Sequence, residues 1–272
     1  MTKELDVSGL KKVSETLLIM VYLRHLETKR KDGIIRDDKS VEIIERLNYD
    51  FSKYSQLYPS ELNQALIAIR TEIIDRFVSK FIAERPQATI VNLGTGLCTR
   101  FFRVDNGKID WYGVDLPVVG EIWSKSIGES PRNKFLIGSV FDGGWMERIK
   151  ASKPQEILFI AEGILMYFSE LEVKYLIYAL LNNFPNSHLI FDSLGKLFLN
   201  HSPINSNPDK IDITYQWGID RLQEIETWDK RIKFVEEWSC LGRYRHRLQW
   251  MGLLGFLPLL KRQVKVGHVR LN

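Results

Sequence analysis

The sequence predicts an α/β protein with a doubly wound, mostly parallel, Rossmann-like sheet of seven strands. Short apolar runs alternate with helical stretches after residue 86, an alternation typical of sheets wound by crossover helices. Glycines directly follow the first apolar run, where a strand would turn into a helix. The residues before that run have helical periodicity only, which predicts an N-terminal helical cap on the sheet.

The cap is expected to span residues 1–85 and to belong to the same domain as the sheet. Apolar residues recur at helical spacing between positions 13 and 25 and form one amphipathic face. Residues 37–40 offer capping side chains in front of a second helical run. The third helical run stops at Pro86, because proline lacks the backbone N–H that a helix interior needs.

The sheet is expected within residues 86–272, which form the core. Five short apolar runs predict buried parallel strands, at 88–94, 109–117, 133–142, 156–163 and 188–193. Two late β-rich runs, 232–240 and 263–271, are expected to pair like a hairpin and to close one edge of the sheet in antiparallel fashion.

Two segments between these strands are distinctive. A helix is expected over 169–184, with Ser169 as its N-cap and Glu172 at the capping-box position. The segment 195–230 contains a polar stretch and several aromatic residues, and it is expected to be an insertion that covers the substrate.

Composition limits the function classes. The chain has 272 residues, 44% of them hydrophobic and 26% charged, as in an ordinary globular protein. A formal net charge of +4, spread along the chain, does not indicate a nucleic-acid surface. Cys98 and Cys240 lack the spacing of a metal site or a disulfide framework. The apolar run Trp250–Leu260 has 11 residues, whereas a membrane span needs about 20. We therefore expect a cytoplasmic protein with no metal, no nucleic-acid partner and no membrane partner.

A nucleotide or nucleoside site is predicted where the first strand ends. Gly94 and Gly96 stand at the strand-to-helix turn and let the backbone approach a ligand closely. Asp115 ends the second strand 21 residues after Gly94, the spacing at which a carboxylate meets the ribose hydroxyls of a nucleotide. The alternative is that Asp115 merely caps the helix that begins near Pro117.

The absence of a third glycine from the turn narrows the choice of cofactor. Thr99 stands where a dinucleotide fingerprint has its third glycine. S-adenosylmethionine has a ribose for Asp115 and no phosphates, so it does not need that glycine. Glu162 ends the fourth strand and is expected to face the same crevice, where the ammonium of a methionine tail is a reasonable partner. Glu162 could instead be a solvent-facing helix cap, and an NAD(P)-dependent oxidoreductase or a non-catalytic binding module could use the same turn.

The chain resembles the leucine carboxyl methyltransferase family, a branch of class I S-adenosylmethionine-dependent methyltransferases. The segments that carry the resemblance are VNLGTGLCTRFFRVDNGKIDWYGVDLP, IGSVFDGGW and FIAEGILMYF. Others look closer to the bacterial branch that contains the carboxyl O-methyltransferase of tetracenomycin polyketide biosynthesis, namely SETLLIMVYLRHLETKRKDGIIRDDKSVEIIERLNYDFS, AIRTEIIDRF, QWGIDRLQEIE and TWDKRIKFVEEWS. The resemblance covers roughly residues 10–240 and implies a methyltransferase sheet with S-adenosylmethionine as cofactor and S-adenosylhomocysteine as product.

The resemblance also implies roles for single residues. Gly94 and Gly96 would approach the methionine moiety, Asp115 would hold the ribose, and Glu162 matches an acidic residue near the cofactor. Arg70 matches an arginine that pairs with the cofactor carboxylate, and a bidentate guanidinium contact gives that pairing a physical reason. Without the resemblance, Arg70 would be interpreted as an exposed helix charge.

The adenine and transfer sites complete the prediction. Many family members carry an Asp-Leu pair after the third strand, whereas this chain has Ser139-Val140 with Asp142 two places later. Either Asp142 or a backbone carbonyl could therefore accept the adenine amine. Leu116 is included in the predicted cofactor site, and Tyr167 matches a tyrosine that faces the transfer site.

The methyl acceptor is expected to be a carboxylate or phenolic hydroxyl of a small, polyketide-like molecule. Tyr215, Trp217 and His201 are the candidate acceptor residues, although the aromatic side chains of this region could equally pack the cap. A carboxylate acceptor is ionised at neutral pH and needs no base, whereas a hydroxyl would make His201 or His246 a candidate base. Methylation of a protein's C-terminal carboxylate is the rival function within the family.

Overall fold

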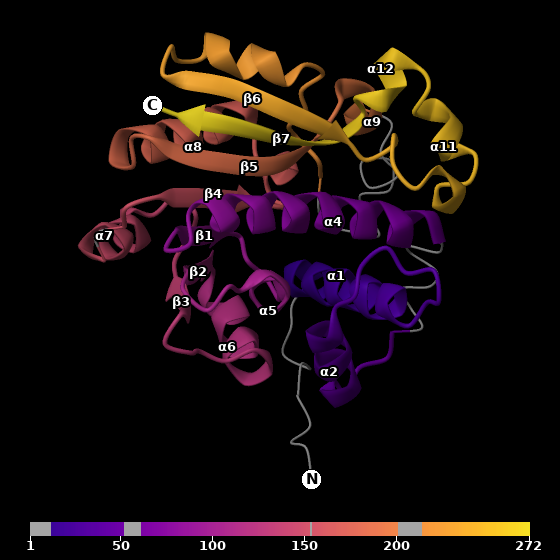
Figure 1. Ribbon diagram of the computed structural model, residues 1–272, viewed down its shortest axis with the longest axis horizontal. Coiled ribbons are helices and arrows are strands. Elements are labelled where there is room, and N and C mark those ends of the chain that lie inside the picture. Colours follow the sequence, from indigo (N-terminus) through magenta and orange to yellow (C-terminus); the bar gives the residue numbers. More distant parts are fainter. Residues whose placement is uncertain (1–11, 52–60, 153, 201–213) are drawn as a thin grey trace.

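The computed structural model describes residues 12–51, 61–152, 154–200 and 214–272 (Figure 1). Its centre is one seven-stranded sheet in the order β3-β2-β1-β4-β5-β7-β6. The strands are β1 Thr89–Leu93, β2 Asp110–Asp115, β3 Asn133–Ile137, β4 Ile157–Ala161, β5 Ser187–Leu194, β6 Ile232–Ser239 and β7 Val264–Leu271. The predicted seven-stranded, doubly wound sheet is confirmed, and each strand falls on one of the expected runs.

The first five strands are parallel and the last two are antiparallel. β1 pairs with β2 and β4, and the chain reverses its winding direction between these two neighbours. β7 inserts between β5 and β6 and runs antiparallel to both, so the expected antiparallel edge is confirmed. All residues of β1 and β4 are buried, as the continuous apolar runs predicted for strands covered on both faces.

Helices cover both faces of the sheet and extend beyond it (Figure 1). The α-helices are α1 Lys12–Thr28, α2 Asp38–Arg46, α4 Glu61–Glu84, α5 Arg100–Val104, α6 Pro117–Ser126, α7 Gly143–Ala151, α8 Glu170–Asn183, α9 Lys196–Asn200, α11 Met251–Leu254 and α12 Pro258–Lys261. Three short 3₁₀ turns are η1 Leu165–Tyr167, η2 Leu222–Thr227 and η3 Arg245–Arg247.

Two large apolar cores lie on opposite sides of the sheet. One contains side chains of α4 and α5, such as Ile74, with alternate strand residues such as Ile90. The other contains side chains of α7, α8 and η2, with the intervening strand residues such as Val91. The alternation follows from the strand period of two, because neighbouring residues point to opposite faces. A smaller core joins α1 and α2 to α6, and it packs the helical cap against the sheet layer.

The expected helix boundaries are confirmed by their caps. Asp37 caps α2 through its side chain, which accepts the Ser40 N–H at 3.1 Å. Ser169 and Glu172 form the predicted capping box at the start of α8. α4 ends two residues before Pro86. Among the helices of the described ranges, none combines the length and apolar character that crossing a bilayer requires.

A charged network at the carboxyl ends of the strands

The glycine turn after β1 has a backbone that only glycine adopts easily. Gly94 has φ of 60° and Gly96 has φ of 51°, both in the left-handed region. A Cβ on Gly94 would collide with the side chain of Ile164, and one on Gly96 would meet Leu17 of α1. The turn is therefore pressed between the β4–η1 connection and the helical cap.

Asp115 lies at the end of β2 and holds this turn. Its carboxylate accepts the N–H of Gly96 at 2.7 Å and the N–H of Leu116 at 2.8 Å. Burial raises the pKa of Asp115 despite these two hydrogen bonds. α6 has Leu116 as its N-cap and no side-chain cap. Asp115 thus holds the glycine turn, and the alternative that its side chain caps α6 is not what the structure shows.

Glu162 lies at the end of β4 between two arginines. Arg70 Nε is 2.9 Å from Glu162 Oε1, and Arg100 Nη2 is 2.6 Å from Oε2. Burial alone would raise the pKa of Glu162, but the two guanidinium groups outweigh it and lower the pKa well below its usual range. Glu162 is therefore neither solvent-facing nor a helix cap, and Arg70 is mostly buried rather than an exposed helix charge.

Asp192 is a site residue that the sequence analysis missed. It lies on β5, where its carboxylate accepts the Gly163 N–H at 2.6 Å and Arg70 Nη1 at 2.8 Å. Burial raises the pKa of Asp192, and the nearby Glu162 charge adds to the rise against the opposing effect of Arg70. The run HLIFDS carried the signal, because its Asp lies near the carboxyl end of a parallel strand, two residues before β5 ends at Leu194.

Arg100 is the second residue that was missed. Its side chain is 1% exposed, and it reaches from the start of α5 to Glu162 and to Asp75 of α4, with Arg100 Nε 2.6 Å from Asp75 Oδ1. Arg103 binds the other oxygen of Asp75 at 2.6 Å. The end of β4, α4 and α5 are thus connected through alternating charges. No single stretch of sequence shows this connection.

The same network continues into the cap through the fully buried Asp37. Arg103 Nη1 lies 2.8 Å from Asp37 Oδ2, and Thr99 donates its hydroxyl to the same oxygen at 2.5 Å. Arg24 of α1 lies 3.0 Å from this carboxylate and also donates to the carbonyl of Leu97 at 3.0 Å. Thr99, which replaces the third glycine of the dinucleotide fingerprint, therefore fastens the glycine turn to the helical cap.

The residues predicted around the adenine lie near the ends of β2 and β3. Leu116 is 45% exposed beside Asp115. Ser139 donates its N–H to Asp142 Oδ2 at 2.7 Å, whereas the side chain of Val140 is buried in the core. Asp142 is the exposed N-cap residue of α7. One of the Asp142 oxygens is thus used to shape its own loop.

The predicted acceptor residues are not all brought together. Tyr167 and Tyr215 are neighbours, with ring centroids 5.4 Å apart, and Gln216 holds this arrangement by donating to the Tyr167 carbonyl at 2.9 Å. Trp217 is different, because it is 2% exposed and packs in the core near Phe191. Its assignment to an open acceptor slot is therefore corrected, since a buried indole has no free face to offer.

Of the two candidate bases, His246 lies within the described residues. His201 lies outside the described residues. His246 is exposed on η3, the turn that packs against α11 and α4. In the part of the chain that the structure describes, no group of three or more His, Cys, Asp or Glu side chains could hold a metal ion.

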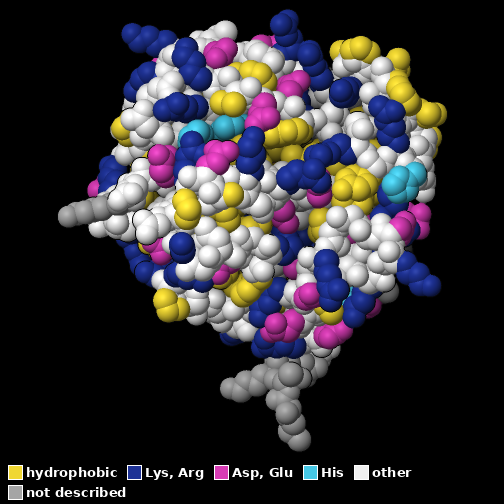
Figure 2. All heavy atoms as spheres, in the orientation of Figure 1, with side chains coloured by type: hydrophobic (Ala, Val, Ile, Leu, Met, Phe, Trp, Pro, Cys, Tyr) yellow, Lys and Arg dark blue, Asp and Glu magenta, His cyan; other side chains and the backbone are white. Residues whose placement is uncertain are grey.

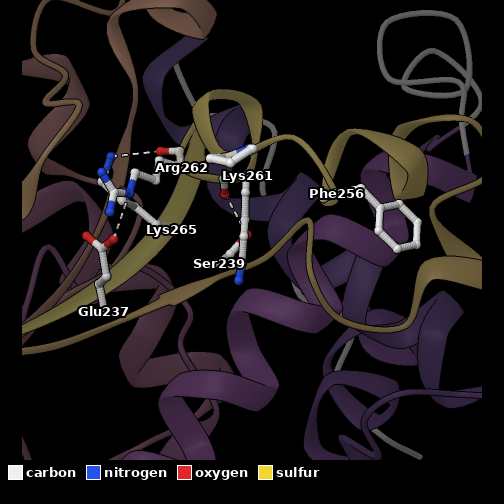
Figure 3. Close-up of a pocket in the computed structure, with 8 residues that line it drawn as sticks. Glu237, Ser239, Phe256, Lys261, Arg262 and Lys265 are labelled. Atoms are coloured by element: carbon white, nitrogen blue, oxygen red, sulfur yellow. Dashed lines mark hydrogen bonds and ion pairs between the residues drawn. The ribbon is translucent and has the colours of Figure 1, made fainter.

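A cleft of about 460 Å³ lies elsewhere, near the start of β7 (Figure 3). Glu237, Arg262 and Lys265 line one part of it, and Phe256 lies at another. The Lys265 ammonium donates to the carbonyls of Ile219 and Arg262, the latter at 2.8 Å, and burial lowers the pKa of Lys265 to about 8. None of the predicted cofactor residues lines this cleft.

Comparison with known proteins identifies the family. Residues 18–181 match the sequence profile of leucine carboxyl methyltransferases, and that span is more than half of the chain. The protein belongs to the leucine carboxyl methyltransferase family. The matched span contains most of the cap, the glycine turn, Asp115 and Glu162. Membership of this family makes the chain an S-adenosylmethionine-dependent methyltransferase.

Curated relatives of this family member extend over nearly the whole chain. The tetracenomycin polyketide synthesis O-methyltransferase TcmP of Streptomyces glaucescens is 26% identical over 230 residues, which cover 84% of this chain and 83% of TcmP. The S-adenosyl-L-methionine-dependent methyltransferase dpfgK of Gibberella zeae is 24% identical over 261 residues, covering 89% of this chain and 87% of the relative.

Solved structures of similar fold support the same architecture. A DUF574 family protein from Streptomyces avermitilis superposes with a TM-score of 0.63 at 12% identity, covering 96% of this chain and all of that one. Magnesium protoporphyrin IX methyltransferase of Synechocystis PCC 6803, with S-adenosylhomocysteine bound, has a TM-score of 0.51 at 13% identity and covers 87% of this chain and all of that one. At these identities the likeness is one of fold.

Proposed function

We propose that this methyltransferase transfers a methyl group from S-adenosylmethionine to an oxygen of a small, polyketide-like molecule, either a carboxylate or a phenolic hydroxyl. The observation that carries the proposal is the match to TcmP, which extends over most of both chains and is described as an O-methyltransferase of polyketide synthesis. The residues at the carboxyl ends of the strands supply groups suited to each part of the cofactor.

The ribose would be held by Asp115. Its carboxylate lies at the end of β2 and is mostly buried, and burial raises its pKa. Ribose hydroxyls would donate to it and stabilise its charge. Gly94 and Gly96 let the side chains of Ile164 and Leu17 pack directly on the turn, because a Cβ on either glycine would collide with them.

The methionine end would lie near Arg70, Glu162 and Asp192. These groups fit an amino acid, because a guanidinium can bind the carboxylate while a carboxylate accepts the ammonium. Arg70 is shared by Glu162 and Asp192. Arg100 keeps Glu162 neutralised when Arg70 turns to the cofactor carboxylate, so Arg70 can exchange partners without leaving Glu162 unpaired.

The adenine would lie between the ends of β2 and β3. Leu116 and Ile137 expose apolar side chains there, 45% and 62% accessible, and offer a surface for a flat ring. Asp142 or a backbone carbonyl of the Ser139–Val140 loop would accept the adenine amine. The Ser139 N–H fixes that loop through Asp142, so either acceptor would be presented by a shaped segment.

The bound cofactor supplies an electrophilic methyl group, and displacement on it is favoured chiefly by holding the acceptor close and in line. Tyr167 and Tyr215 are the pair that would orient the acceptor, since each carries a hydroxyl and an aromatic face. A carboxylate acceptor is already ionised at neutral pH. No general base among the chain's residues is then required.

The proposal is tested by the chemical stability of the product. The purified protein would be incubated with methyl-labelled S-adenosylmethionine and matched pairs of aromatic acids and phenols. Label in an acid that mild alkali releases as methanol indicates a methyl ester, and alkali-stable label in a phenol indicates an ether. Label on neither, with transfer to a peptide C-terminus instead, would contradict a small-molecule acceptor.

Cofactor binding is measured separately by calorimetry with S-adenosylmethionine, S-adenosylhomocysteine and NADH. We expect micromolar binding of the first two and none of NADH. Binding of NADH alone would contradict both the family assignment and the proposed site.

A further inference from the structure

The segment that follows β6 combines exposed apolar side chains with basic residues and no acidic ones. From residue 238 to the C-terminus the chain has no Asp or Glu, and its basic residues are Arg243, Arg245, Arg247, Lys261, Arg262, Lys265 and Arg270. Within it, five large apolar residues are each between 53% and 68% exposed: Trp250, Leu253, Phe256, Leu257 and Leu259. We call these five residues the apolar tip.

The apolar tip is held in place by a well-packed base. Leu241, Leu248 and Met251 are buried in the core that lies under α4. Gly255 lies so close to the backbone of Leu241 that a Cβ would collide with its carbonyl. The exposed side chains therefore stand outward from a fixed platform. Figure 1 shows α11 and α12 at the periphery of the molecule, and Figure 2 shows hydrophobic side chains gathered over that region with Lys and Arg side chains beside them.

Some of the surrounding positive charges are already compensated. Arg247 is buried against Glu27 at 2.8 Å, Arg243 lies 3.3 Å from Glu72, and Lys265 is used by two backbone carbonyls. Among the described contacts, no carboxylate pairs with Arg245 or Lys261, and both side chains are exposed.

Arg245 and Lys261 flank the tip directly. The Arg245 guanidinium lies over the Phe256 ring at 3.7 Å from its centroid. Lys261 is the last residue of α12. Leu259 lies in the same helix, and Leu257 is its N-cap residue. The tip thus presents apolar side chains with uncompensated cations at their margin.

We propose that the apolar tip is a peripheral docking site for a lipid bilayer surface that contains anionic headgroups. Trp and Leu side chains enter the headgroup–acyl boundary, while Arg and Lys extend to the phosphates at its margin. This proposal differs from the expectation of no membrane partner. It needs no spanning helix, and none is found among the described residues, because the contact is interfacial.

Charge favours this occupant over a protein. A second copy of the chain would bring Arg245 and Lys261 of both copies to the same interface without compensating acids, which is unfavourable. A bilayer, in contrast, deforms around a projecting apolar group and supplies anionic charge on all sides.

The test is co-sedimentation of the full chain with phosphatidylcholine vesicles, with and without phosphatidylglycerol. We expect binding to the anionic vesicles, weaker binding at high salt, and little binding to the neutral ones. Leu253→Ser combined with Leu259→Ser should lower the partition coefficient about tenfold or more, and Lys261→Glu should do so by a similar factor.

Matched controls separate this surface from general effects. Leu171→Ser changes a leucine that is 78% exposed on α8, and Lys80→Glu reverses an exposed charge near the C-terminal end of α4. Both should bind vesicles as the wild type does, and all variants should keep their affinity for S-adenosylmethionine. Absence of wild-type binding to anionic vesicles would overturn the proposal. It would also be overturned by a wild-type dimer that Leu253→Ser converts to a monomer, because the tip would then be a self-association surface.

Discussion

The Asp115 carboxylate accepts the backbone N–H of Gly96 at 2.7 Å and so joins the end of β2 to the glycine turn after β1. β1 and β2 are neighbouring parallel strands; Asp115 is the last residue of β2, and Gly96 lies in the turn that follows β1 at the same edge of the sheet. The turn is therefore held in its left-handed conformation by a side chain that is also the proposed ribose ligand. Loss of this carboxylate should affect both the turn and the cofactor.

Replacing Asp115 by alanine should lower the affinity for S-adenosylmethionine about 10- to 100-fold. The reason is the loss of a charged hydrogen bond, which contributes about 1.5–3 kcal/mol. Unfolding should be easier by about 1–2 kcal/mol, because the Gly96 N–H loses its acceptor. Calorimetry and urea unfolding measure the two effects. Asp110→Ala, at the exposed start of the same strand, is the control and should change neither. Unchanged affinity of Asp115→Ala would remove Asp115 from the ribose site.

Replacing Arg100 by alanine should destabilise the fold by about 3–5 kcal/mol, since it leaves Glu162 and Asp75 partly buried without their shared partner. Arg36→Ala is the matched control, because Arg36 pairs with Asp38 where both side chains are largely exposed, and such pairs contribute at most about 1 kcal/mol. Urea midpoints of the two variants give the comparison. Similar small losses would show that the buried arginine network is not important for stability.

Tyr167→Phe should lower turnover more than it lowers cofactor affinity, because the proposed role of the hydroxyl is to orient the acceptor. The ring and its packing against Tyr215 are retained in this variant. Tyr175→Phe is the control, since Tyr175 is 58% exposed on α8 and should leave turnover unchanged. Equal turnover in Tyr167→Phe and the wild type would exclude Tyr167 from the transfer site.

The fold could be predicted almost completely from the sequence, because its signals are local. The strands are short apolar runs, and the cap of α8 is encoded by Ser169 and Glu172 alone. Asp115 and Glu162 could be placed at one edge because both end parallel strands. Asp192 follows the same rule and could have been found by it.

The charge network could not be predicted in the same way. Arg100 and Asp75 are 25 residues apart, and Arg24 and Leu97 are 73 apart, so their contacts depend on how the cap packs on the sheet. Arg70 shows the same limit, because family resemblance suggested its ligand but not its partners Glu162 and Asp192. The burial of Trp217 was likewise decided by tertiary packing, since an aromatic residue in a predicted insertion gives no local sign of its depth.

The final prediction concerns pH and the buried pair His188 and His268, whose ring nitrogens Nδ1 and Nε2 lie 2.9 Å apart. Burial, with the neighbouring positive charges, lowers the pKa of His188 to about 4 and that of His268 to about 3. The unfolded chain protonates these histidines below about pH 6.5 while the folded chain does not, so their contribution to stability is lost as the pH falls from about 6.5 towards 4. Between pH 7 and pH 5 we expect a loss of about 1–2 kcal/mol per histidine. Asp115 and Asp192 have raised pKa values and therefore add stability as the pH falls, so the free energies of unfolding of the variants must be compared at each pH.

In urea unfolding, His268→Gln should show about half of the wild-type pH dependence, whereas the exposed His246→Gln should retain all of it. Equal slopes in all three proteins would show that the buried pair is not what titrates.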